Sequence, residues 1–252
     1  MSTRKVALVT GSGKRRVGSF VAEALAAKGY SLVVHYRSSA AEATASVEAF
    51  RSRGVEAIAV QADLTEDRQI DTMVEETIAH FGRIDVLVNC AAVWESKKLE
   101  DVTASDVRRY FETNTLGTYL CSQKAGLAMV RQPEGGCIIT IGDWAVVRPY
   151  ANYAAYFPSK GAIPTLTRTL AVELGSRNPA VRVNGILPGP VMLPPDLPEA
   201  ERRAAIDATL VKREGRPEHI AQAVLFLVEN DFVTGVCLPV DGGRSIYAPD
   251  SV

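Results

Sequence analysis

Short apolar, β-branched runs alternate along the chain with longer amphipathic stretches. Val6 to Val9 is apolar throughout and leads into Thr10-Gly11, which predicts a buried strand. Similar runs predict seven strands, at residues 6–9, 32–36, 57–60, 84–88, 138–141, 181–187 and 236–240. Helices are predicted between them at residues 17–28, 40–53, 67–81, 104–131, 153–174, 199–210 and 218–228. This alternation predicts an α/β fold with a doubly wound, seven-stranded parallel sheet flanked by helices, and a ligand crevice at the carboxyl ends of the strands.

One stretch does not follow this pattern. Residues 188–198 contain five prolines, so they form neither a helix nor a central strand. A plain connecting loop is one interpretation. A flap over the crevice is the other, and we favour it because the stretch follows directly on the carboxyl end of a strand.

Composition limits the class of protein. The chain has 252 residues, 47% of them hydrophobic, and a net charge of −1, which indicates neither a nucleic-acid nor a membrane partner. Four cysteines without C-x-x-C spacing indicate reduced thiols rather than a disulfide framework or a metal site. There is no signal-peptide pattern, and no apolar run approaches the roughly 20 residues of a membrane span. A cytoplasmic protein without a metal is expected.

The candidate chemistry lies around residue 150. Tyr156 and Lys160 are four residues apart on a predicted helix, which places a phenol and an ammonium on one face. A nearby ammonium is expected to lower the phenol pKa and make Tyr156 a usable acid. Asp143 lies thirteen residues before Tyr156. Its carboxylate is expected to decide which double bond this acid helps to reduce.

The turn after the first strand indicates a phosphate site. Gly11 and Gly18 allow the backbone to approach a pyrophosphate, and the following helix N-terminus, from Val17, favours its charge. Any tight turn can use glycine, so three cations within the turn, Lys14, Arg15 and Arg16, make the interpretation more specific.

The end of the second strand indicates which dinucleotide binds. An NAD site would place an acid there for the ribose hydroxyl, whereas Tyr36 is followed by Arg37 and Ser38. Arg37 can pair with a 2′-phosphate and Ser38 can hydrogen-bond it, which predicts NADPH/NADP+. An ordinary solvated arginine is the alternative.

Later strand ends supply further candidate contacts. Asp63, which precedes Leu64, is placed to accept from an adenine amino group or to cap a helix. Asn89 and Ala91 follow the fourth strand, where small residues let a cofactor pass close to the backbone.

Together these motifs resemble the short-chain dehydrogenase/reductase superfamily. The match runs from Thr10-Gly11 through Asn89, Asn114 and Tyr156-x-x-x-Lys160 to Pro188-Gly189 and Asp241-Gly242-Gly243. The resemblance implies a single Rossmann domain over residues 1–252, a nicotinamide cofactor, a small-molecule substrate and a homotetramer. It also implies that Tyr156 is the acid, that Lys160 lowers its pKa and holds the nicotinamide ribose, and that Asn114 supports a proton-relay water. Asn114 can also be a helix-interior residue bonded to backbone, and both roles can hold at the same time.

The cofactor is accordingly expected to contact Gly11, Lys14, Arg15, Arg16, Val17, Gly18, Tyr36, Arg37, Ser38, Asp63, Leu64, Asn89, Ala91, Tyr156, Lys160, Pro188 and Gly189. The phosphate turn is one residue longer than the family pattern, so either Arg15 or Arg16 can be the family arginine.

Asp143 departs from the superfamily pattern, in which most members carry serine. An ionised carboxylate only accepts hydrogen bonds and repels a developing alkoxide, so it suits a substrate with N–H donors, such as a ring with a C=N bond. The Arg16-Val17-Gly18 ending, the second strand and Trp94 are similar to the pteridine reductase branch. Trp94 is expected to stack on a flat substrate, or else to pack under a loop.

The leading hypothesis is therefore an NADPH-dependent, pteridine reductase-like enzyme. Its catalytic residues would be Asp143, Tyr156, Lys160 and Asn114, and its substrate contacts Trp94, Asp143, Tyr156 and Val191. The alternatives are a carbonyl reductase of the 3-oxoacyl thioester type and a non-catalytic NADPH-binding sensor.

Overall fold

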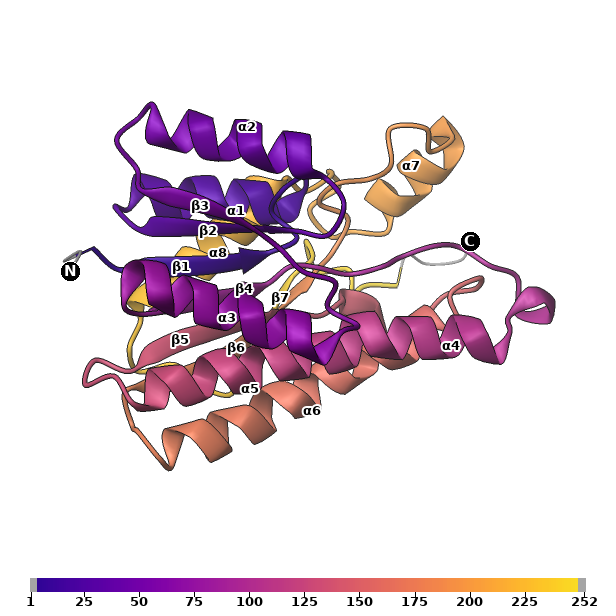
Figure 1. Cartoon of the computed structure of the whole chain (residues 1–252). Helices are drawn as coiled ribbons and strands as arrows, with labels where there is room; N and C mark the ends of the chain where they lie inside the picture. Colours follow the sequence, from indigo (N-terminus) through magenta and orange to yellow (C-terminus); the bar gives the residue numbers. More distant parts are fainter. Residues whose placement is uncertain (1–3, 249–252) are drawn as a thin grey trace.

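The computed structural model describes residues 4–248 and is built around a parallel sheet (Figure 1). Its strands are β1 (Val6–Thr10), β2 (Ser31–Tyr36), β3 (Ala57–Gln61), β4 (Val86–Asn89), β5 (Gly136–Ile141), β6 (Val181–Pro188) and β7 (Cys237–Val240). They lie in the order β3-β2-β1-β4-β5-β6-β7, and every neighbouring pair is parallel. The predicted fold class is confirmed, and each predicted strand is present within two residues of its expected ends.

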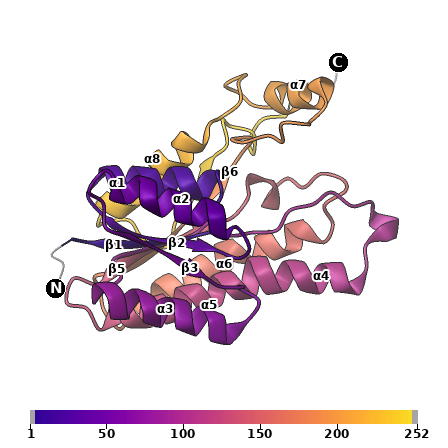
Figure 2. The ribbon, with the colours of Figure 1, turned by 45° about the horizontal axis from the view of Figure 1, so that its top comes forward.

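Helices cover both faces of the sheet (Figure 2). They are α1 (Val17–Ala27), α2 (Ala40–Arg51), α3 (Asp67–Phe81), α4 (Ala104–Tyr110), α5 (Gly117–Val130), α6 (Tyr156–Gly175), α7 (Glu199–Asp207) and α8 (Pro217–Glu229). Successive strand residues alternate between the two layers. Val9 packs in the core cluster with Leu25 of α1, and Leu8 in the cluster with Met73 of α3. None of the described helices is long and apolar enough to cross a membrane.

The helix predicted at residues 104–131 is wrong as a single α-helix. A π-helical turn, Phe111–Leu116, separates α4 from α5. The turn carries Asn114, whose side chain bonds both the N–H and the carbonyl of Val93, at 2.8 and 3.0 Å. A local i→i+5 turn of this kind is frequent at functional sites.

Two other helix limits differ from prediction by three residues, and the remaining limits agree within two. The helix expected from residue 153 begins at Tyr156. A start at Tyr156 places Pro158 in the first turn, where its missing N–H is not needed, whereas Pro164 lies in the interior of the same helix. The helix expected at residues 199–210 ends at Asp207.

The order of the strands places the crevice. The chain passes from β1 to β2 on one side, and β4 then pairs on the other side of β1. Thr10 lies beside Asn89 at the ends of these two strands, and the Ala91 N–H donates to the Thr10 hydroxyl at 3.1 Å. A ligand binds at such a switch point in doubly wound sheets.

A buried carboxylate secures the opposite end of β1. Asp85 Oδ2 accepts from the Val6 N–H at 2.8 Å and from Arg83 Nε at 2.9 Å, and Oδ1 accepts from Arg83 Nη2 at 2.6 Å. The Asp85 side chain is 7% exposed. Removing it leaves the Val6 N–H without its acceptor and leaves the Arg83 guanidinium with only Glu134, at 3.5 Å.

We expect Asp85→Ala to lower the free energy of unfolding by about 3 kcal/mol, because it breaks a largely buried, bidentate ion pair. Urea denaturation measures the change. Asp71→Ala is the matched control: Asp71 pairs with Lys124 at the surface, with side chains 40% and 37% exposed, and its loss should cost under about 1 kcal/mol. Equal losses in the two variants would contradict this account.

Candidate active site

Asp143 and Tyr156 meet through a hydrogen bond at the carboxyl edge of the sheet. Asp143 follows β5, and Tyr156 is the first residue of α6. The Tyr156 hydroxyl donates to Asp143 Oδ2 at 2.9 Å, and the Ala145 N–H donates to Oδ1 at 2.8 Å. Both carboxylate oxygens therefore accept a hydrogen bond, which fixes the orientation of the group.

Lys160 lies one helical turn after Tyr156. Its Nζ donates to the carbonyl of Ile141 at 2.7 Å, and the residue is 3% exposed. Burial lowers the pKa of Lys160 to about 8, although the charge of Asp143 opposes the shift. Lys160 is therefore charged below this pH and loses its charge above it.

The phenol of Tyr156 is harder to ionise than a free tyrosine. Burial raises the pKa of Tyr156 well above its usual value, and the charge and hydrogen bond of Asp143 raise it further. The expected lowering of this pKa by the Lys160 ammonium is not seen, because burial and the charge of Asp143 raise the pKa. The ammonium is bonded to the carbonyl of Ile141, while the carboxylate contacts the hydroxyl. Tyr156 consequently holds its proton at neutral pH.

Asp143 is balanced between opposing influences. Burial raises the pKa of Asp143 above its usual value. Hydrogen bonds from Ala145 and Tyr156 and the charges of Lys160 and Arg244 all oppose that rise. The net shift is upward, so the charge of this carboxylate depends on its cationic neighbours.

Asp143, Tyr156 and Lys160 line one cavity of about 620 Å³. Such a volume suits a small-molecule site. The cavity is also lined by five other residues predicted to contact cofactor or substrate, namely Val17, Trp94, Pro188, Gly189 and Val191. The structure thus brings together residues from α1, from the loop after β4 and from the end of β6.

Aromatic rings form much of the cavity wall. Trp94 stacks on Tyr153 with ring centroids 5.3 Å apart and planes 15° apart. Trp144 stacks on Tyr150 at 6.0 Å and 18°. Trp94 is 43% exposed, so its packing against Tyr153 still leaves part of the indole open. Flat, partly open rings of this kind favour a flat ligand.

The proline-rich stretch lies along this cavity. The prediction that residues 188–198 contain neither helix nor central strand is wrong at Pro188, which ends β6, where the last position of a strand tolerates a proline; residues 189–198 contain no helix or strand. Val191, Met192 and Leu193 line the cavity, as do Glu201 and Ala205 of α7. The stretch is therefore part of the wall, in keeping with its predicted position over the crevice.

Asn114 lies outside the cavity lining. It is fully buried, and besides Val93 its Nδ2 donates to the Ser159 hydroxyl at 3.1 Å. Ser159 belongs to the same helix as Tyr156 and Lys160. Asn114 thus connects the π-helical turn, the loop after β4 and α6, which matches the interpretation of a helix residue bonded to backbone.

The glycine-rich turn is held against the end of β2. The N–H groups of Ser12 and Gly13 donate to the carbonyl of His35 at 3.1 and 3.2 Å, and the Gly11 N–H donates to His35 Nδ1 at 2.9 Å. Gly11 has φ +65°, and a Cβ there would lie 2.9 Å from the Ala91 Cα. A side chain at Gly11 would be strained as well as crowded.

Exposed cations surround this turn. They are Lys14, Arg15, Arg16 and Arg37, and the neighbouring Ser38 is exposed as well. Arg15 lies 3.5 Å from Glu23 and 4.4 Å above the ring of Phe20, so it packs along α1. Within residues 4–248, no ion pair forms at Lys14, Arg16 or Arg37. Tyr36 is nearby, with its Cβ close to Gly13.

The residues after β3 and β4 form contacts within the protein. Asp63 Oδ1 accepts from the N–H and the hydroxyl of Thr65, at 3.0 and 2.9 Å, and the N-cap of α3 is Glu66. Helix capping by Asp63, one of its two expected roles, is therefore wrong. Leu64 is buried beneath α5, close to Gly117. Asn89 donates to Ser122 at 3.0 Å, and its Oδ1 is buried without a hydrogen-bond partner.

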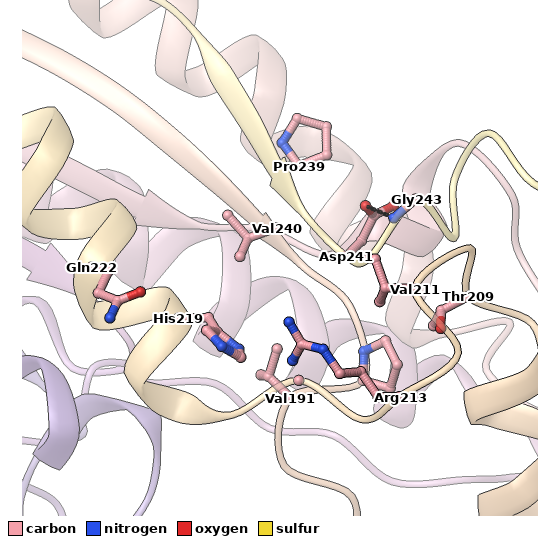
Figure 3. A pocket seen from close by; sticks show the side chains of 13 residues that line it. Val191, Thr209, Val211, Arg213, His219, Gln222, Pro239, Val240, Asp241 and Gly243 are labelled. Atoms are coloured by element: carbon pink, nitrogen blue, oxygen red, sulfur yellow. Dashed lines mark hydrogen bonds between the residues drawn. The ribbon is translucent and has the colours of Figure 1, made fainter.

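A second cavity, of about 450 Å³, shares Pro190 and Val191 with the first (Figure 3). Arg213 and His219 face it from the loop before α8 and from α8. The carboxylate of Asp241 at its edge accepts from the N–H groups of Gly243 and Ser245. Asp143, Tyr156 and Lys160 do not line it, so the larger cavity is the candidate active site.

Three groups around the site have no counterpart among the predicted site residues. His35 fixes the phosphate turn, Tyr150 and Tyr153 supply cavity walls, and Arg244 enters the cavity from the turn after β7. The repeated spacing of Tyr150, Tyr153 and Tyr156 was a usable signal in the sequence. Arg244 offered none, because its position depends on the path of the chain after β7.

Comparisons with known proteins agree with this geometry. A family model described as enoyl-(acyl carrier protein) reductase matches residues 12–245. An uncharacterized oxidoreductase of Methylorubrum extorquens is 39% identical over 246 residues, covering 95% of this chain and 97% of the relative. A 3-oxoacyl-[acyl-carrier-protein] reductase of Synechocystis is 34% identical over 249 residues, covering 97% and 98%.

A solved structure also matches along nearly the whole chain. It is a blue fluorescent protein from a metagenomic library, in complex with NADPH. It has a TM-score of 0.87 and 34% identity, and the match covers 95% of this chain and 97% of that one. Together with the parallel sheet and the Tyr156–Lys160 pair, these matches show that the chain belongs to the short-chain dehydrogenase/reductase superfamily.

Proposed function

We propose that this protein is an NADPH-dependent, pteridine reductase-like enzyme that reduces a C=N bond of a pterin or related heterocycle. Membership of the superfamily makes the chain an NAD(P)-dependent oxidoreductase. The observation that carries the finer proposal is the hydrogen bond from Tyr156 to Asp143 at 2.9 Å. It places an acceptor-only carboxylate where most of the superfamily has a serine hydroxyl.

The residues around the phosphate turn fit the cofactor. Helix α1 begins without a capping side chain and has no acid in its first turn, so its first N–H groups remain available for a pyrophosphate. Arg37 and Ser38, with Lys14, Arg15 or Arg16, would hold the 2′-phosphate. Asp63 and Leu64 would contact the adenine, and Asn89 and Ala91 the adjoining ribose. When bound, NADPH supplies a hydride.

Proton handling follows from the charges of the chain itself. Tyr156 keeps its proton at neutral pH and has Asp143 as its acceptor. A substrate ring N–H can take the place of the phenol at the carboxylate, and Tyr156 can then donate its proton toward the ring nitrogen or a water beside it. A developing alkoxide on a ketone would instead face the negative charge of Asp143. Lys160 offsets that charge from within the same cavity.

The walls of the cavity support a flat substrate. We propose that the open part of Trp94 stacks on the heterocycle, with Val191 packing beside it. Stacking would hold the ring plane in a fixed orientation. Such positioning accelerates a reaction, because the reacting atoms are already aligned. Asn114 would act indirectly, because its hydrogen bond to Ser159 holds α6, which carries Tyr156 and Lys160.

The alternative is a carbonyl reductase of the 3-oxoacyl thioester type. The relative from Synechocystis with this description, 34% identical over nearly the whole chain, favours it. This activity requires Asp143 to be protonated or bypassed by a water. The upward shift of the Asp143 pKa is in its favour, whereas the hydrogen bond with Tyr156 is against it.

Asp143→Asn should abolish pterin turnover, with a loss of at least about 100-fold in kcat, because the amide cannot serve as an anionic acceptor. Binding of NADPH, followed by its fluorescence, should change less than twofold. Asp101→Asn, on an exposed turn, is the control and should keep full activity. Full pterin turnover by Asp143→Asn would contradict the role of Asp143 as an anionic hydrogen-bond acceptor.

Arg37→Gln should raise the KM for NADPH by roughly 10- to 100-fold, because a charge-assisted contact with the 2′-phosphate is lost. The KM for NADH, which lacks that phosphate, should stay the same. Steady-state kinetics with both cofactors measures the difference, and Arg68→Gln, an exposed arginine of α3, serves as control. An equal change for both cofactors would place the 2′-phosphate elsewhere.

The rate should also depend on the charge of Lys160. Its pKa is lowered to about 8, so the ammonium is present below that pH and is lost above it. We expect kcat/KM for reduction to fall as pH rises through about 8. Lys160→Arg keeps its charge at high pH and should lack this basic limb, even if it is slower. A wild-type profile that stays flat to about pH 9.5 would contradict the assignment.

A further inference from the structure

Arg244 joins the cavity that contains Asp143 to the turn after β7. It lies just after β7, in a turn closed by Asp241, whose carboxylate accepts from the N–H groups of Gly243 at 2.9 Å and Ser245 at 2.7 Å. Arg148 donates to the carbonyl of Arg244 at 3.5 Å. The backbone at Arg244 is therefore held from both sides, and its side chain leaves from a fixed point.

The side chain crosses to two other elements of the cavity wall. The guanidinium carbon lies 4.5 Å from the centre of the Trp144 ring, a cation–π contact. Nη1 donates to the carbonyl of Ala205 in α7. Trp144 is the neighbour of Asp143 in the chain, and α7 carries Glu201 and Ala205 of the cavity wall. Arg244 thus connects two parts of the cavity wall, the turn that carries Trp144 and helix α7.

The guanidinium is not neutralised by an ion pair. No salt bridge forms at Arg244 within the described part of the chain, and its Nε is buried without a hydrogen-bond partner. Both carboxylate oxygens of Asp241 accept hydrogen bonds from backbone N–H groups, and neither forms an ion pair with Arg244. The guanidinium is half-buried, and its Nε loses water without gaining a hydrogen-bond partner, which calls for an explanation beyond packing.

Asp143 is the anion whose charged form Arg244 stabilises. Both residues line the same cavity, and the charge of Arg244 opposes the effect of burial on the pKa of Asp143. The groups that face Asp143 come from several elements. They are Tyr156 and Lys160 of α6, Tyr150 of the segment before α6, and Arg244, while Glu201 of α7 lines the same cavity.

Among residues 4–248, two cations line the cavity, Lys160 and Arg244. Burial draws the pKa of Lys160 down to about 8, so part of its charge is already lost at mildly alkaline pH. A guanidinium keeps its charge across this range. Arg244 therefore supplies the charge that persists.

We propose that Arg244 is a positioning residue for the reaction: it holds a permanent positive charge beside Asp143 and so keeps that group a carboxylate that accepts hydrogen bonds. This inference rests on the proposed function, because it adds a residue to the same site. It also means that a movement of α7, which is bonded to Arg244, would change the charge balance at Asp143.

The test measures the titration of Asp143 itself. Protein labelled with carboxyl ¹³C-aspartate is titrated by NMR, and the Asp143 signal is assigned from its absence in Asp143→Asn. In Arg244→Met the midpoint should rise by about 0.5 to 1 pH unit, because an opposing charge is removed. Arg244→Lys should show a smaller rise, since a flexible ammonium restores part of the charge.

Matched variants separate charge from packing. Arg203→Met removes an 81% exposed arginine of α7 and should leave the midpoint unchanged. Arg244→Gln is a second neutral variant that keeps a donor for Ala205, and it serves if Arg244→Met does not fold. Equal Asp143 midpoints in the wild type and a folded neutral variant would overturn the proposal.

The same variants give a kinetic readout. The acid limb of kcat/KM, for whichever substrate the protein reduces, should move upward with the Asp143 midpoint. A purely structural role would lower the rate equally at every pH. Because the NMR titration needs no substrate, a shifted midpoint without pterin turnover would refute the proposed function and still support the role of Arg244.

Discussion

The charge of the Asp143 carboxylate, which burial disfavours, is the constraint on which the proposed site depends. Burial opposes the charge of Asp143, and the fold counters it with two hydrogen bonds and two cations. These groups come from the turn after β5, from α6 and from the turn after β7. At this edge of the sheet, Ala145, Tyr156, Lys160 and Arg244 all favour the charged form of Asp143.

The same constraint changes how the tyrosine should be understood. A tyrosine beside a lysine suggests a phenol made acidic by an ammonium, yet Tyr156 donates to Asp143 and Lys160 donates to the carbonyl of Ile141. The phenol is therefore a proton reservoir next to an acceptor. A ring with N–H groups complements this pair better than a ketone does, because the ketone oxygen gains negative charge as it is reduced.

The periodicity of the sequence was enough to predict the sheet, because buried parallel strands are apolar throughout and their helices are amphipathic. It was also enough to place Asp143, Tyr156 and Lys160 at one strand edge. It could not predict the π-helical turn at Asn114, which depends on a side chain bonding the distant backbone of Val93. Nor could it place Arg244 over Trp144, since residues 100 apart in sequence meet there only through the tertiary fold.

The most direct test is to compare substrates of the wild-type protein with NADPH, by following its oxidation with a dihydropterin and with a 3-oxoacyl thioester under identical conditions. The account predicts a kcat/KM for the dihydropterin at least about 100-fold above that for the thioester, because the transition state of the ketone would lie against the charge of Asp143. Faster turnover of the thioester would contradict the claim that this carboxylate selects a C=N substrate.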